Sequence, residues 1–149
     1  MLTKEALEAD LQSAMRASDD VRKRTLRMVL TAIKLAEVDR RGPLDEPALL
    51  AVLQKEDKSR RETIEEAKQA NRNDLVDSTQ AEIAVLQNYL PQPLTPDELE
   101  TLARQVIDEV EASGPGFVGK VMKVLIPRVQ GRADGKVVNV LVRNLLNEL

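Results

Sequence analysis

Ten residues near the C-terminus, QGRADGKVVN at positions 130–139, combine residue types that could hold an anion. Glycine lets a backbone approach a ligand closely, and an aspartate can cap the helix that follows. Free N–H groups at a helix N-terminus, with cations beside them, form a binding place for phosphate. The residues of this turn are Gly131, Arg132, Asp134, Gly135 and Lys136.

The same turn also fits a structure without any ligand. In that interpretation Gly131, Asp134 and Gly135 are only the cap and turn before the last helix, and the two cations are solvated. The spacing matches neither a nucleotide-hydrolase phosphate loop nor a dinucleotide-binding fingerprint, so nucleotide hydrolysis is not supported. The residues alone leave the structural and the anion-binding alternatives open.

The composition excludes several kinds of catalytic and metal site. The chain has 149 residues, with no cysteine and no histidine. Disulfides, thiolate nucleophiles, histidine-based triads and the commonest transition-metal ligands are therefore excluded. Lysine, aspartate or tyrosine could still serve an enzyme, but no motif singles one out. We expect no catalytic residues, no metal and no cofactor.

Charge is segregated within the C-terminal third of the chain. Residues 95–113 have six acids against one arginine, whereas residues 114–147 have six cations against one acid. One explanation is that acids and cations of neighbouring helices form surface ion pairs, which contribute little to stability. The functional explanation is that the cations form a basic face, which contacts the phosphates of a structured RNA. Its candidate contacts are Lys120, Lys123, Arg128, Arg132, Lys136 and Arg143.

Apolar residues recur at helical spacing along nearly the whole chain, which predicts an all-α fold. Three prolines between residues 91 and 96 interrupt this pattern, and Thr95 and Glu98 after them form a capping box. We therefore predict an N-terminal bundle of about four helices (1–90) and a C-terminal three-helix unit (91–149). The expected helices include one at roughly 4–17 and one from near Pro47 to about Ala70. Apolar stripes within 26–36, 75–90, 99–110, 117–125 and 138–145 indicate the others, with a stop at Gly42-Pro43 after the first of these stripes.

The densest charged run, LQKEDKSRRETIEEAK at 53–68, mixes both signs. Lys58 can pair with Glu62, and Arg61 with Glu65, because residues four apart lie on one helix face. Such patterning favours a solvated face over a binding face. No apolar run approaches the length of a membrane span and the N-terminus has no apolar leader, so we expect a soluble, cytoplasmic protein without membrane contact.

Four separated stretches resemble the YqeY family, stand-alone relatives of the C-terminal tail of the tRNA-dependent amidotransferase B subunit. They are LRMVLTAIKLAEVD (26–39), LQKEDKSRRETIEEAKQANRNDL (53–75), LQNYLPQPLTPDEL (86–99) and GKVMKVLIPRVQGRADGKVVNVLVRNLL (119–146). The last stretch is the most specific. Thr63 departs from the pattern, because serine is more usual there.

The resemblance implies an N-terminal helical bundle and a C-terminal three-helix unit like the amidotransferase tail, which contacts tRNA. We therefore expect a tRNA-binding or amidotransferase-associated accessory module that is not catalytic by itself and binds no DNA. The alternative is a protein-interaction module that docks on amidotransferase subunits or an aminoacyl-tRNA synthetase. The family's label as a carbon–nitrogen ligase with glutamine as amido donor implies an enzyme, the interpretation that we favour least.

Overall fold

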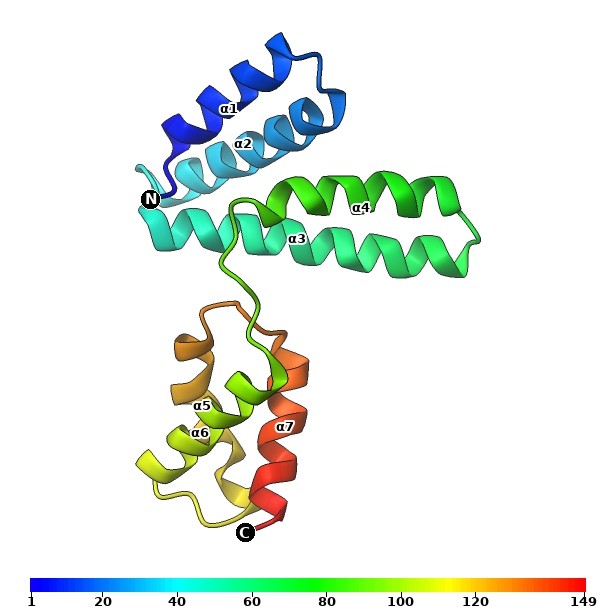
Figure 1. The fold of residues 1–149 in the computed structure, drawn as a ribbon. Helices are drawn as coiled ribbons and strands as arrows, with labels where there is room; N and C mark the ends of the chain where they lie inside the picture. The colour runs from blue at the N-terminus through cyan, green and yellow to red at the C-terminus, as the bar shows by residue number, and fades with distance from the viewer. The chain divides into compact units, whose positions relative to one another are not determined.

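The computed structural model describes all 149 residues and contains helices but no strands, which confirms the all-α prediction (Figure 1). The elements are α1 (Lys4–Arg16), α2 (Asp20–Arg40), α3 (Glu46–Gln69), α4 (Asn73–Gln87), α5 (Pro96–Glu109), the short 3-10 helix η1 (Pro115–Phe117), α6 (Val118–Val129) and α7 (Gly135–Asn147). Their contacts divide the chain into two compact units, Met1–Leu90 and Pro91–Leu149. No helix is both long and apolar enough to cross a membrane.

The N-terminal unit consists of two helical hairpins, α1–α2 and α3–α4 (Figure 1). Helix α2 packs against both α3 and α4, so it joins the hairpins. The main core lies where α1, α2, α3 and α4 meet, and a smaller cluster fills the far end of α3–α4. The main core comprises Leu7, Leu26, Val29, Ile33, Leu49, Leu53 and Leu86, and the smaller cluster Ile64, Ala67 and Val76.

A side-chain cap begins each of the first three helices. Thr3, Asp19 and Asp45 each accept a backbone N–H bond at the start of α1, α2 and α3. These oxygens satisfy donors that a helix leaves without a partner inside itself. Residue Arg41, with φ of 61°, ends α2, so the stop comes one residue before Gly42. In the first turn of α4, Val76 is buried whereas Leu75 is 40% exposed.

The C-terminal unit packs α5, α6 and α7 around one aliphatic core. Helix α5 begins at the predicted capping box, in which Thr95 and Glu98 each bond the other's backbone N–H. Helix α6 continues through Pro127 to Val129, so this proline lies in the last turn and does not end the helix. The core residues are Leu99, Ala103, Val106, Ile107, Val121, Leu125, Val129, Val138, Val142, Leu145 and Leu146.

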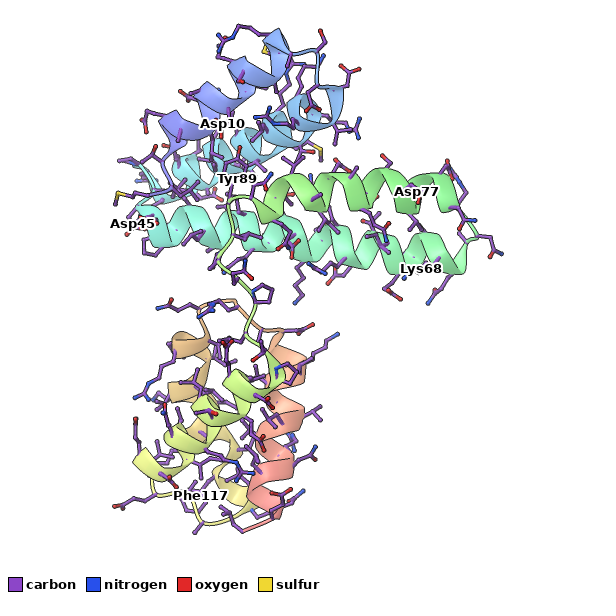
Figure 2. All side chains as sticks on the ribbon, viewed as in Figure 1. Asp10, Asp45, Lys68, Asp77, Tyr89 and Phe117 are labelled. Carbon is purple, nitrogen blue, oxygen red and sulfur yellow. The ribbon has the colours of Figure 1, made fainter.

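The chain's single tyrosine ties the end of the N-terminal unit back to its first helix. The Tyr89 hydroxyl donates to a carboxylate oxygen of Asp10 at 2.6 Å, and the two side chains lie together in Figure 2. Burial and, after it, the bond to Asp10 raise the pKa of Tyr89 from 10.0 to about 12. The contact's contribution to stability is therefore complete below pH 10.0 and is lost as the pH rises toward about 12.

We expect a spectrophotometric titration of the tyrosine to have its midpoint near the raised pKa of about 12. Because no tryptophan is present and Tyr89 is the only tyrosine, the absorbance change reports this hydroxyl alone. Asp10→Asn removes the nearby negative charge but leaves the burial, so the midpoint should fall only part of the way toward 10.0. A wild-type midpoint at the ordinary value would contradict the contact.

Candidate functional site

The turn before α7 needs one glycine and one aspartate. Gln130 and Gly131 both have positive φ, 53° and 74°, and reverse the chain after α6. Asp134 is the N-cap of α7, and its carboxylate accepts the Lys136 backbone N–H at 2.9 Å. Gly135 is the first residue of α7 and has open space where a Cβ would lie, so nothing in its surroundings requires glycine.

Arg132 has a structural contact that the sequence did not reveal. Its Nε donates to the carbonyl oxygen of Gln92 at 2.7 Å, and its own carbonyl accepts the Leu94 N–H at 2.9 Å. These two bonds hold the proline-rich segment before α5 against the turn before α7. Arg132 is therefore engaged within the C-terminal unit, although we expected its side chain to be free for a phosphate.

Arg128 is also engaged, because its guanidinium forms a two-bond pair with the Glu109 carboxylate, with Nη1 at 2.9 Å from Oε1. This bonding lowers the pKa of Glu109 below its ordinary value. Both arginines line a shallow hollow along α5, beside Leu94 and Leu102. In this hollow Arg128 is paired with a carboxylate, whereas Arg132 donates from Nε to a neutral backbone carbonyl.

The other four candidate cations are less constrained. The Lys120 ammonium lies 5.9 Å from the centre of the Phe117 ring, and the Arg143 Nε donates to Asn139 at 2.7 Å. The ammonium groups of Lys123 and Lys136 form no hydrogen bond or ion pair, so their positive charge is not neutralised by any neighbour.

The solvent-facing side of α7 combines these cations with exposed apolar groups. Positions 136, 140 and 143 recur at helical spacing on this side, with Val137 beside them, while the opposite side faces the core. Val137 is 57% exposed and Val140 58%. We define the α7 outer face as Lys136, Val137, Val140 and Arg143.

Helix α6 has a similar outer side, on which Lys120 and Lys123 are exposed and Ile126 is 41% exposed. The only acid between residues 114 and 147 is Asp134, which is occupied as the α7 cap. No residue within α6 or α7 therefore contributes a carboxylate to these outer sides.

Asp134→Ala should lower the free energy of unfolding of the C-terminal unit by about 0.5–2 kcal/mol, the usual cost of a lost N-cap. The alanine leaves the Lys136 backbone N–H without its acceptor at 2.9 Å. Urea denaturation followed by circular dichroism measures the change. Asp134→Asn retains an acceptor oxygen and should recover most of the loss, so equal effects of the two substitutions would refute a capping role.

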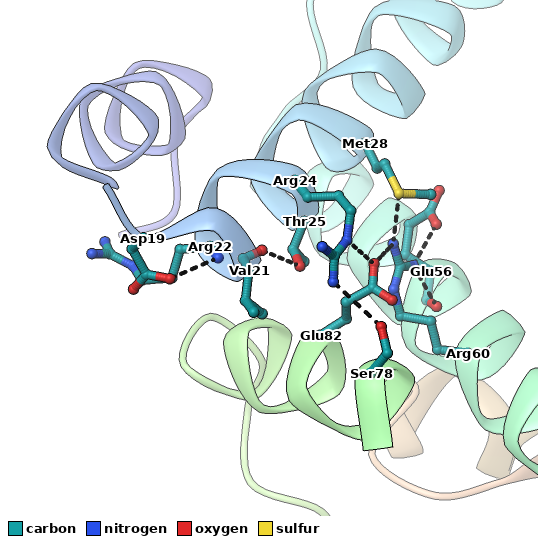
Figure 3. Close-up of polar contacts among 10 residues, drawn as sticks. All are labelled: Asp19, Val21, Arg22, Arg24, Thr25, Met28, Glu56, Arg60, Ser78 and Glu82. Carbon is teal, nitrogen blue, oxygen red and sulfur yellow. Dashed lines mark hydrogen bonds and ion pairs between the residues drawn. The ribbon is translucent and has the colours of Figure 1, made fainter. Parts of the chain in front are cut away.

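A buried ionic network in the N-terminal unit was not foreseen (Figure 3). Arg60 is only 6% exposed and donates from Nη1 to the Glu56 carboxylate at 2.8 Å and to the Glu56 carbonyl at 3.0 Å. Its Nη2 lies 3.8 Å from Glu82 of α4, which also lies 3.7 Å from Arg24 of α2. One charged cluster therefore connects α2, α3 and α4.

The sequence predicted a solvated face and different pairs for this part of α3. The expected pairs Lys58–Glu62 and Arg61–Glu65 do not form, and Arg61 instead contacts Asp57 at 2.9 Å. A signal for the burial of Arg60 was nevertheless present. Its position continues the apolar stripe of Leu53 and Ile64 at spacings of seven and four, so it faces the same way as the core.

Comparisons with known proteins match the chain to one protein family and to relatives with mitochondrial names. The model of the family described as Yqey-like protein matches residues 4–146. A protein of Lachancea thermotolerans named "Altered inheritance of mitochondria protein 41, mitochondrial" is 39% identical over 74% of this chain and 61% of its own length. Proteins of the same name from Kluyveromyces lactis and Saccharomyces cerevisiae are 34% and 29% identical, over 88% and 87% of this chain and 69% of each relative.

These names correct two of our expectations. They refer to the inheritance of mitochondria, and not to tRNA, amidotransferases, synthetases or carbon–nitrogen ligases. The prediction of an amidotransferase-associated, tRNA-binding module is therefore wrong, because the relatives are not such modules. The cytoplasmic assignment, which rested on the lack of an apolar leader, is wrong for the same reason, since the relatives are mitochondrial proteins. The family itself agrees with the resemblance in the sequence: the chain belongs to the YqeY-like protein family.

Proposed function

We propose that this chain is a non-catalytic docking module that acts in mitochondria and supports their inheritance. The names of its relatives motivate the place and the process. The observation that carries the docking role is the α7 outer face, where two exposed valines lie between two cations and the nearest acid along the chain is the capping Asp134. The partner that fits this chemistry is an acidic protein segment with aliphatic side chains.

Charge complementarity supports this choice of partner. Lys136 has no ion-pair partner within the chain, and Arg143 bonds only the neutral Asn139. A carboxylate-rich partner would supply the missing counter-charges and steer the encounter, as complementary potentials do in other complexes. The two arginines already bound to Glu109 and Gln92 contribute to the unit's own structure and are not part of the docking face.

Apolar contact would supply the remaining affinity. Val137 and Val140 are each more than half exposed on a helix whose other side is fully packed. Burying aliphatic surface stabilises a complex by roughly 25 cal/mol per Å² before the costs of association are subtracted. Alternating charge and aliphatic groups therefore match an amphipathic helix with acids at its edges.

Replacement of the relative in Saccharomyces cerevisiae tests the proposal. Cells that lack their own protein would express this chain behind a mitochondrial targeting sequence, and the fraction of daughter cells that receive mitochondria would be counted. We expect the wild-type chain to restore inheritance. Lys136→Glu combined with Arg143→Glu should not, because two acids on the α7 outer face repel an acidic partner.

The matched control changes the same number of charges elsewhere. Lys34→Glu combined with Lys58→Glu alters two exposed, unpaired lysines of the N-terminal unit, so it should restore inheritance as well as the wild type. Immunoblotting verifies equal protein levels. Full restoration by the Lys136 and Arg143 double variant, or failure of the wild-type chain, would overturn the proposal.

A further inference from the structure

Met28 of α2 lies at the edge of the buried ionic network (Figure 3). Its side chain is 48% exposed, yet its sulfur accepts from the Arg60 Nη2 of α3 at 3.6 Å. A thioether is a weak acceptor, particularly for a charged donor. The contact therefore joins the oxidisable sulfur of a half-exposed residue to a guanidinium that is almost fully buried.

The Arg60 guanidinium has more donors than acceptors in this site. Arginine carries five N–H groups. The Nη1 group bonds Glu56, whereas Nη2 faces the Met28 sulfur and lies 3.8 Å from Glu82. The buried Nε has no acceptor at all. Because unsatisfied buried donors cost free energy, an additional oxygen at this edge of the guanidinium would stabilise the unit.

We propose that Met28 is an oxidation site at which a peroxide-class oxidant strengthens the packing of α2 on α3. The sulfur lone pair attacks one oxygen of hydrogen peroxide, an S–O bond forms and the O–O bond breaks. The sulfur loses two electrons and becomes a sulfoxide, while the departing hydroxide takes the remaining proton and leaves as water. The sulfoxide oxygen then accepts from the Arg60 guanidinium.

The direction of the effect distinguishes this site from ordinary oxidative damage. Conversion of methionine to its sulfoxide usually weakens a protein, because it puts a polar group into apolar contacts. Met28 instead faces a charged donor, and its exposed side leaves room for the new oxygen. A sulfoxide oxygen is a stronger acceptor than a thioether sulfur, so the sulfoxide should be a better partner for the charged Arg60 guanidinium.

Met15 provides a matched control within the same unit. It is 45% exposed, close to the value for Met28, and its sulfur has no polar contact. Two proteins are treated with hydrogen peroxide: Met15→Leu combined with Met122→Leu, which retains Met28, and Met28→Leu, which retains Met15. Peptide mass spectrometry verifies which sulfur carries oxygen. Fluorescence of Tyr89 follows urea unfolding of the N-terminal unit without interference from tryptophan.

We expect the sulfoxide at Met28 to raise the urea midpoint. The ratio of folded to unfolded protein should rise about tenfold, which corresponds to the free energy of a hydrogen bond to a charged group. Reduction by methionine sulfoxide reductases should return the midpoint to its starting value. Oxidation of the Met28→Leu protein, confined to Met1, Met15 and Met122, should not raise it. A urea midpoint that falls or stays unchanged when Met28 is oxidised in the Met15→Leu, Met122→Leu protein would overturn the proposal.

A second pair of variants tests the same contact without oxidant. Met28→Gln puts an amide oxygen near the guanidinium, whereas Met28→Leu has a similar shape and no acceptor. Although glutamine is less apolar, we expect its urea midpoint to exceed that of Met28→Leu. If leucine gives the higher midpoint, the Arg60 edge does not need an oxygen acceptor and the proposal fails.

Discussion

Arg60→Ala is expected to lower the free energy of unfolding of the N-terminal unit by about 3–5 kcal/mol, the effect of removing one partner from a buried charge pair. Arg60 is 6% exposed, and the Glu56 and Glu82 side chains around it are only 24% and 13% exposed. Truncation leaves two poorly solvated carboxylates on neighbouring helices. The lower end of the range applies, because Glu82 keeps Arg24 at 3.7 Å.

The adjacent Arg61 is the control for this experiment. It pairs with Asp57 at 2.9 Å, as Arg60 pairs with Glu56, but its side chain is 57% exposed. Arg61→Ala should therefore cost less than about 1 kcal/mol, as exposed pairs do. Urea denaturation followed by Tyr89 fluorescence measures both variants. Equal losses from the two substitutions would show that the network does not support the unit.

Leu125→Ala should destabilise the C-terminal unit by about 2–5 kcal/mol and leave the N-terminal unit unchanged. Leu125 is fully buried in the core of the C-terminal unit, which shares no buried residue with the cores of Met1–Leu90. A cavity in that core removes contacts from α5, α6 and α7 only. Amide hydrogen exchange should therefore accelerate in these three helices and keep its wild-type rate in α1–α4.

Ile126→Ala is the matched substitution on the same helix. Ile126 is 41% exposed and lies outside the core, so its truncation should have a much smaller effect than that of Leu125. Faster exchange in α1–α4 of the Leu125→Ala protein would contradict separate cores.

Features that depend on neighbouring residues were predictable from the sequence. The Thr3 cap and the capping box of Thr95 and Glu98 involve residues three positions apart, so the sequence pattern contains the whole interaction. Features that need distant segments were missed. Arg60 depends on Glu82, and Arg132 on the Gln92 carbonyl 40 positions away, and neither contact leaves a signal in the local pattern.

Function was harder to predict than fold for a physical reason. A count of cations between residues 114 and 147 does not separate those that hold the unit together from those that face solvent. The structure assigns Arg128 to Glu109 and Arg132 to the chain before α5, which leaves lysines and Arg143 with valines beside them. The sequence predicted a phosphate-binding cluster of six cations. The surface proposed from the structure, the α7 outer face, is smaller and contains both charged and apolar side chains.

The most direct test of the docking role is a titration of the nitrogen-15-labelled chain with a synthetic helical peptide of glutamate and leucine. We predict amide shift changes concentrated at Lys136, Val137, Val140 and Arg143 of α7, with smaller ones on α6. A lysine–leucine peptide of the same pattern should cause none, and Lys136→Glu with Arg143→Glu should abolish those caused by the acidic peptide. Shifts of equal size at Lys34 and Lys58 of the N-terminal unit, or none on α7, would contradict a docking face on this helix.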